Sequence, residues 1–219
     1  MSLFVVDYEY MPDAIQMYQD SLYLLQSNRL KCQELLSKDE LDENDIIDIY
    51  ISLHIVLEVG LNALHRQIIT SQIVKPIDRL EVIKNIDGIG FIEKTILFIY
   101  NAHFDFRSDL DESAIHHKII GKLRSFAGIR NKLLHGHSIG SLTNDDNVTR
   151  VSEARSNLGI NKLKAQIKLF VDINNGMNFF LDHLDNDGWS EGYIEDLKNE
   201  YLNYSFIPAN FITNEIPER

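Results

Sequence analysis

The residues best suited to chemistry in this sequence lie in one short stretch, Arg130-Asn131-Lys132-Leu133-Leu134-His135. An arginine presents a planar fork of donors that matches a phosphate group. A histidine can accept or donate a proton near neutral pH. Held close together, Arg130 and His135 would supply the two groups that a metal-free site needs to cleave a phosphodiester bond.

The segment around this stretch is basic, although the chain as a whole is acidic. Between His116 and His137 there are five Lys or Arg residues and no Asp or Glu, whereas the 219-residue chain has a formal net charge of -12. Such acidity argues against indiscriminate binding of nucleic acid, because phosphate contacts need local positive charge. The basic segment supplies that charge in one place, and its residues Lys132 and Arg124 are the candidates for binding substrate.

Whether Arg130 and His135 can meet depends on where their helix ends. At about 100° per residue, the two positions lie about 140° apart on an ideal helix, so they do not share a face while the helix continues. Gly136 is typical of a residue that ends a helix in a left-handed conformation. We therefore predict that the helix ends near Leu134 and that the two side chains converge. His135 would then lie beside the exposed carbonyls of the helix end, which favour a protonated imidazole.

A second polar group lies on an otherwise apolar helix earlier in the chain. His54, Glu58, Asn62 and His65 fall within an arc of about 80° at 100° per residue. A polar strip on such a helix needs partners or water. We predict that Glu58 orients Arg130 or His135, with His54 in support. The alternatives are a strip that faces solvent and an internal hydrogen-bond network.

Other kinds of site find less support in the sequence. A structural metal ion needs more ligands than the pair His54 and Glu58 offers, so no metal and no cofactor are predicted. The single cysteine, Cys32, excludes a disulfide framework and cysteine-rich zinc sites. Without a leader resembling a signal peptide or an uncharged apolar run of membrane-spanning length, we expect a cytoplasmic protein that does not engage a membrane.

The elements that must position these residues are all helices. Only four prolines and eleven glycines occur, and apolar residues recur at spacings of three and four. Asp42 begins a segment that resembles a capping box. The pattern predicts helices over about 12–36, 43–72, 91–102, 112–134, 159–184 and 190–201.

The helices are expected to form one domain, 1–219, with no internal repeat. Its core, about 11–184, would be an up-down bundle of four main helices with short extra helices. The remainder, 185–219, is predicted to hold a final helix and an apolar tail that lies on the body or on a partner.

The stretch from Arg130 to His135, together with this order of helices, resembles the HEPN superfamily (higher eukaryote and prokaryote nucleotide-binding domains). Its members are small helical bundles with an Arg-x(4–6)-His motif near the end of a late helix, often beginning Arg-Asn. The resemblance covers roughly Met11 to Leu184 and includes two long helices, a connection, a short helix, the motif helix and a closing helix.

The resemblance implies a metal-independent endoribonuclease in which two protomers pair so that both motifs face a shared cleft. Arg130 would hold the scissile phosphate and stabilise charge in the transition state. His135 would act as general base or acid for attack by the ribose 2′-hydroxyl. Asn131 would position backbone or substrate. The implied setting is toxin–antitoxin or antiviral, with an antitoxin or other protein as a further partner.

One departure from the family concerns regulation. Several toxin members have a tyrosine two residues after the motif histidine, as a target for modification by a partner nucleotidyltransferase, and here that position is His137. Some superfamily members have also lost activity and serve as binding modules. The alternative function is therefore a non-catalytic HEPN-like module that binds a protein partner or a nucleotide, and whether the chain is an enzyme stays open at this point.

Overall fold

The structure is a computed structural model of the chain, and it describes residues 11–71, 81, 83–85, 88–103, 110–134, 158–184 and 191–212. Within these ranges, side chains are described except at 11–18, 69–71, 100–103, 110–116, 130–134, 183–184 and 191. The described residues form helices joined by turns and contain no strand, so the predicted all-α class is confirmed.

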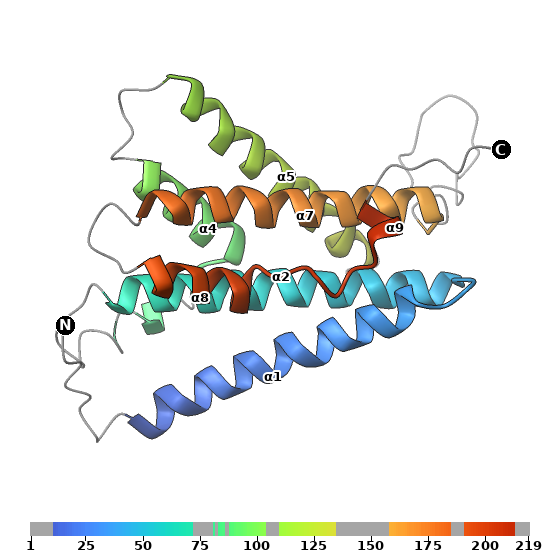
Figure 1. Cartoon of the computed structure of the whole chain (residues 1–219), viewed down its shortest axis with the longest axis horizontal. Coiled ribbons are helices and arrows are strands. Elements are labelled where there is room, and N and C mark those ends of the chain that lie inside the picture. The colour runs from blue at the N-terminus through green and yellow to red at the C-terminus, as the bar shows by residue number, and fades with distance from the viewer. Residues whose placement is uncertain are drawn as a thin grey trace, which may run out of the picture.

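The first two helices, α1 (Met11–Leu36) and α2 (Glu43–Ser71), form an antiparallel hairpin (Figure 1). The predicted capping segment starts α2. Asp42 Oδ1 accepts a hydrogen bond from the Asp45 backbone N–H at 2.8 Å, and Asp45 Oδ2 accepts one from the Asp42 N–H at 3.4 Å. This reciprocal pair satisfies donors that the first turn of a helix would leave free.

Three helices pack on α2 from the other side: α4 (Phe91–His103), α5 (Leu110–Leu134) and α7 (Ile160–Leu184). In Figure 1, α2 and α7 run in the same direction and α5 runs in the opposite one. Helices α5 and α7 approach closely because position 176 is glycine. A Cβ atom there would come within 2.2 Å of the Ile119 side chain.

The end of the described chain covers the bundle. Helix α8 (Glu191–Tyr201) crosses α2, and the following residues lead to the short helix α9 (Ala209–Ile212) on α7 (Figure 1). Gly60 gives the Tyr201 carbonyl room, since a Cβ atom there would lie 2.7 Å from that oxygen. Arg29 Nη2 donates to the Glu200 carbonyl at 2.9 Å, which satisfies a carbonyl at the end of α8.

The tail residues complete the hydrophobic core. Phe206, Ile207 and Phe211 are buried, and the Phe206 ring lies 6.1 Å from the ring of Phe170 in α7. The Tyr204 hydroxyl donates to Asn175 Oδ1 at 2.9 Å. The apolar tail therefore lies on the body over residues 204–212, which is one of the two positions that the sequence predicted.

Among the described helices, α2 is the one long and apolar enough to cross a membrane, with a mean hydropathy of 1.5 over its most apolar part. It is also the central helix of the bundle. Leu53, Leu57, Leu61 and Leu64 are almost completely buried against the other helices. Its apolar character is that of a core helix.

Candidate functional site

The polar strip of α2 lies inside the bundle. His54 and His65 are 2% and 1% exposed, while Glu58 and Asn62 between them are half-buried. The interpretation of this strip as a solvent-facing surface is therefore wrong for the two histidines. His54 contacts rings of both α4 and α5, whereas His65 contacts a ring of α4.

His54 lies between two aromatic rings from other helices. Its ring is stacked on that of Phe126 in α5, with 5.9 Å between centroids and an interplanar angle of 5°. The ring of Phe91, the first residue of α4, meets it edge-on at 5.2 Å. One buried imidazole thus touches both neighbouring helices, and it fixes α2 against the motif helix.

Glu58 gives His54 a charged neighbour. Its Oε2 lies 3.2 Å from His54 Nε2, one helical turn away and within ion-pair range. The approach lacks the geometry of a hydrogen bond, and neither ring nitrogen of His54 has a hydrogen-bond partner among the described residues.

The motif follows Phe126 by one turn of α5. The backbone of α5 is helical through Leu134, so Arg130 continues the row of Leu123 and Phe126, both of which are buried. At buried Gln166 of α7, Nε2 donates to the Phe126 carbonyl at 2.8 Å and holds this part of α5 in place. The structure thus brings the α2 strip to the part of α5 that precedes Arg130.

The structure does not describe the side chains of the motif residues. Arg130, Asn131 and Lys132 have described backbones without described side chains, and His135 and His137 lie outside the described residues. The predicted convergence of Arg130, His135 and Glu58 stays a prediction. Arg124 is exposed on α5, as a residue that binds substrate would need to be.

His65 occupies a different environment eleven residues further along α2. Its ring packs on the ring of Phe98 in α4, with 5.2 Å between the ring centroids. Burial, together with the nearby Lys94 ammonium, lowers the pKa of His65 to about 3. His65 is therefore neutral at physiological pH, and it does not share the carboxylate neighbour that His54 has.

A second basic stretch was missed by the sequence analysis. Residues 158–171 contain Lys162, Lys164 and Lys168 and no Asp or Glu. The antiparallel packing of α7 on α5 places this stretch beside the basic segment of α5. The absence of acids was visible in the sequence, but the adjacency of the two stretches required the tertiary structure.

The described residues contain no group of three or more His, Cys, Asp and Glu side chains that could hold a metal ion. Cys32 is completely buried, and burial raises the pKa of its thiol to about 12. A thiol in that state is a weak nucleophile at neutral pH. The chemistry available to the described part of the chain rests on histidines, carboxylates and cations.

No protein-family model, curated protein or solved structure matches this chain.

Proposed function

We propose that this chain is a metal-independent endoribonuclease of the HEPN type, with Arg130 and His135 as its catalytic residues and two protomers forming the site. It would act in the cytoplasm as a toxin or antiviral effector. The observation that carries the proposal is the stacking of His54, which has the Glu58 carboxylate 3.2 Å away, on Phe126 of α5, one turn before Arg130.

The order of the helices supports the family assignment. Two long helices, a connection, a short helix, a motif helix and a closing helix follow one another in the described chain. We propose that these correspond to a HEPN-like bundle whose four main helices are α1, α2, α5 and α7, within one domain. Helices α4, α8 and α9 would then be the additional short elements.

The directions of α2 and α5 support a meeting of Glu58 with Arg130. In a helix each Cα–Cβ bond tilts toward the N-terminus. In Figure 1, α2 and α5 run in opposite directions, so Glu58 and Arg130 lie one turn to either side of the level at which His54 meets Phe126, about 12 Å apart along the helix axes. The tilt of the Cα–Cβ bonds favours side chains that reach back toward that level, as the Glu58 carboxylate does in approaching His54. A guanidinium at this level would pair with the carboxylate and leave donors for a phosphate.

The proposed reaction is an in-line transfer at phosphorus. The ribose 2′-oxygen forms a bond to the phosphorus while the bond from phosphorus to the 5′-oxygen breaks, which leaves a 2′,3′-cyclic phosphate and a 5′-hydroxyl. His135 would remove the 2′ proton or donate a proton to the leaving oxygen. Arg130 would stabilise the charge that develops on the other phosphate oxygens. Asn131 and His137 would position the motif and its substrate.

The test is cleavage of single-stranded RNA by purified protein in the presence of a chelator. We expect a 2′,3′-cyclic phosphate product, and we expect Arg130→Ala and His135→Ala each to lower the rate by at least about 100-fold. Lys31→Ala, which removes an exposed α1 lysine paired with Asp48 of α2, is the matched control, and thermal unfolding checks that all variants fold. Unchanged cleavage by both motif variants would refute the assignment. Sedimentation velocity tests for the predicted homodimer.

A second candidate function, a module that binds a protein partner without catalysis, is favoured by a hollow of about 470 Å³ beside the α1–α2 turn. Its volume is in the range of binding pockets. Apolar side chains, two exposed acids, one amide and Lys38, whose ammonium is paired with Asp45, line it: Leu36, Leu41, Ile46, Leu158, Ile160, Phe211, Asp39, Glu40, Asn210 and Lys38. The fitting partner is a protein segment with apolar and basic residues, as an antitoxin could provide.

This second candidate predicts binding of a peptide of alternating Leu and Lys, measured by calorimetry, together with no RNA turnover. The double variant Asp39→Lys and Glu40→Lys should abolish binding. The matched control, Glu195→Lys with Asp196→Lys, changes the net charge equally on exposed positions of α8. Equal loss in both variants would show a general charge effect and count against the hollow as the site.

A further inference from the structure

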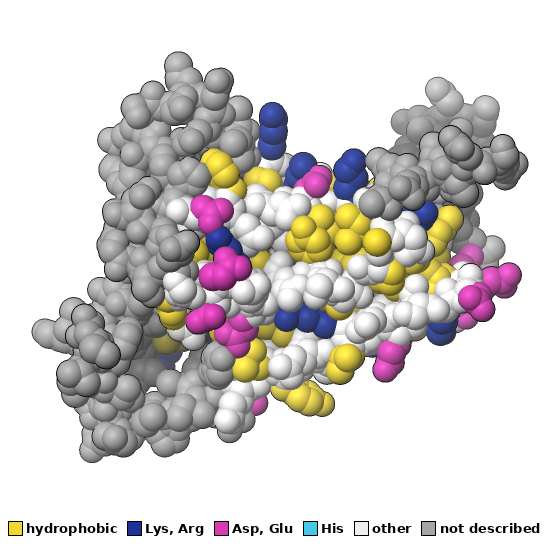
Figure 2. All heavy atoms as spheres, in the orientation of Figure 1, with side chains coloured by type: hydrophobic (Ala, Val, Ile, Leu, Met, Phe, Trp, Pro, Cys, Tyr) yellow, Lys and Arg dark blue, Asp and Glu magenta, His cyan; other side chains and the backbone are white. Residues whose placement is uncertain are grey.

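The fold places the two acid-free basic stretches of the chain side by side. Residues 113–134 of α5 and 158–171 at the start of α7 together hold eight Lys or Arg residues and no Asp or Glu, within a chain of net charge -12. In Figure 2, Lys and Arg side chains project from the upper edge of the molecule, where α5 and α7 lie. Positive charge is therefore concentrated on one helix pair.

Three contacts fix how the two helices are aligned. Ile119 meets Gly176, Lys122 Nζ lies 2.7 Å from Asp172 Oδ2, and Gln166 bonds to the Phe126 carbonyl. As α5 advances, α7 recedes at the same rise of about 1.5 Å per residue. Continuing this alignment by one turn from Phe126 and Gln166 places Lys162 level with Arg130.

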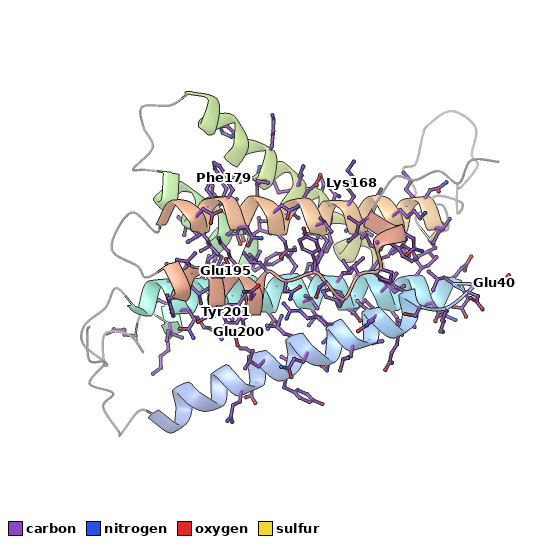
Figure 3. The ribbon with its side chains drawn as sticks, viewed as in Figure 1. Glu40, Lys168, Phe179, Glu195, Glu200 and Tyr201 are labelled. Carbon is purple, nitrogen blue, oxygen red and sulfur yellow. The ribbon has the colours of Figure 1, made fainter. Side chains whose placement is uncertain are left out.

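The cations differ in how available they are. Lys122 is paired with Asp172, and Lys164 lies over the Phe211 ring with its Nζ 5.9 Å from the ring centroid. Four others are exposed, and we call them the basic face: Lys118, Arg124, Lys162 and Lys168. Figure 3 shows Lys168 on the upper side of α7, away from Glu195 and Glu200 of α8 and from Glu40 in the α1–α2 turn.

We infer that the basic face binds the phosphate backbone of a single-stranded RNA and leads it to the motif, with Lys162 contacting a phosphate next to the one held by Arg130. This inference rests on the proposed function. Among the described side chains of α5 and α7, no aromatic ring is exposed and Phe179 is half-buried, so we expect contacts to phosphates more than stacking on bases.

The size of the basic face favours a single strand over a duplex. From Lys118 to Arg130 the helix rises by about 18 Å. Domains that recognise double-stranded RNA contact it over about 16 base pairs, which is a far longer surface.

The inference is tested with an RNA that cannot be cleaved, a fluorescein-labelled 12-nucleotide 2′-O-methyl oligouridine. Its binding is measured by fluorescence anisotropy between about 50 and 200 mM salt. Five phosphate contacts, four on the basic face and one at Arg130, predict a slope of log affinity against log salt of about -3.5, at about -0.7 per contact. The variant Lys118→Gln, Lys162→Gln, Lys168→Gln should reduce the slope by about 2 and weaken binding at least tenfold.

The control variant Lys31→Gln, Lys38→Gln, Lys84→Gln removes the same charge from exposed positions on α1, on the α1–α2 turn and before α4. It should bind almost as the unchanged protein does. If both triple variants weakened RNA binding equally, or if neither did, the result would contradict the proposed role of the basic face in binding RNA. Tighter binding of a duplex of the same length would overturn the single-strand assignment.

The two proposals can fail separately in this design. Binding that depends on the basic face, without any cleavage of ordinary RNA, would keep the basic face and reject the ribonuclease. Cleavage that requires Arg130 and His135, with binding indifferent to the three lysines, would keep the ribonuclease and reject the basic face.

Discussion

Two regions of α2, one around His54 and one around His65, each place a buried histidine next to a charged group, but the two charges have opposite signs. Both histidines are almost completely buried, and both pack on aromatic rings from neighbouring helices. His54 has the Glu58 carboxylate 3.2 Å away, whereas His65 has the Lys94 ammonium nearby. The sign of the neighbouring charge, not burial, separates the two.

The comparison separates a histidine beside a cation from a histidine beside a carboxylate. At His65, burial and a cation both oppose protonation, so the ring is a neutral packing element. His54 has a carboxylate neighbour instead, and its ring stacks on Phe126 of α5. We therefore assign a structural role to His65 and a positioning role to His54.

The largest expected effect concerns stability in acid. Because the pKa of His65 is lowered to about 3, the folded state keeps His65 neutral while the unfolded state protonates it below about 6.5. The stability that this provides is present above pH 6.5 and is lost as the pH falls toward 3. We expect His65 to contribute a slope of up to about 1.4 kcal/mol per pH unit in this window.

Urea unfolding at several pH values measures this slope. His65→Leu, which keeps the volume and cannot be protonated, should flatten the curve between pH 6.5 and 3, while His117→Gln at an exposed position should leave it unchanged. An equally steep curve for His65→Leu would show that other groups cause the loss in acid and would erase the contrast between the two histidines.

The next effect concerns catalytic activity, and here the larger change is expected for a variant of His54 and not for a variant of His65. His54→Leu should lower kcat for RNA cleavage by roughly tenfold to a hundredfold with little change in KM, because a misplaced motif helix costs rate more than binding. It should also change the pH profile of kcat. His65→Leu is the matched control and should cleave RNA at the normal rate at pH 7.5. Two variants with the same kinetics would contradict the division of roles.

A smaller effect tests how firmly the His54 region is held from the far side. Gln166→Leu removes the hydrogen bond from α7 to the Phe126 carbonyl. We expect a loss of about 1 kcal/mol in the free energy of unfolding, the usual net value of one hydrogen bond. Hydrogen exchange should quicken in α5 near Phe126 but not in α4 near Phe98. Uniform quickening in both helices would mean that the two regions are not independent.

The smallest effect is expected at the Lys122–Asp172 ion pair, whose side chains are about one-third exposed. Partly exposed pairs contribute between about 0 and 1 kcal/mol. Lys122→Gln should therefore shift thermal unfolding by only a few degrees, and less at high salt than at low salt. A shift larger than that of Gln166→Leu would show that charge, not the buried hydrogen bond, fixes α5 on α7.

The helices were predictable because their signals are local. The predicted 12–36, 112–134 and 190–201 compare with Met11–Leu36, Leu110–Leu134 and Glu191–Tyr201 in the structure. Caps, prolines and apolar spacing act within a few residues, so one sequence contains them. The Asp42 cap is an example, since both of its hydrogen bonds stay within four residues.

The surroundings of the candidate site were harder to predict, because they depend on which helices meet. The sequence identified the polar strip of α2 but not the burial of His54, which requires Phe91 and Phe126 from two other helices. Likewise, Lys162 gained significance only when α7 was found antiparallel to α5. The positions of Arg130 and His135 relative to Glu58 stay predictions, because their side chains lie outside the described residues.

The covering of the bundle by α8 and the tail bears on how the protein is made. A ribosome synthesises Phe206, Ile207 and Phe211 after all the helices that they cover, yet these residues are buried in the core. Arg29, made early, has to wait for the Glu200 carbonyl that it caps. In the nascent chain, the hydrophobic core would therefore stay incomplete until residue 212 has left the exit tunnel.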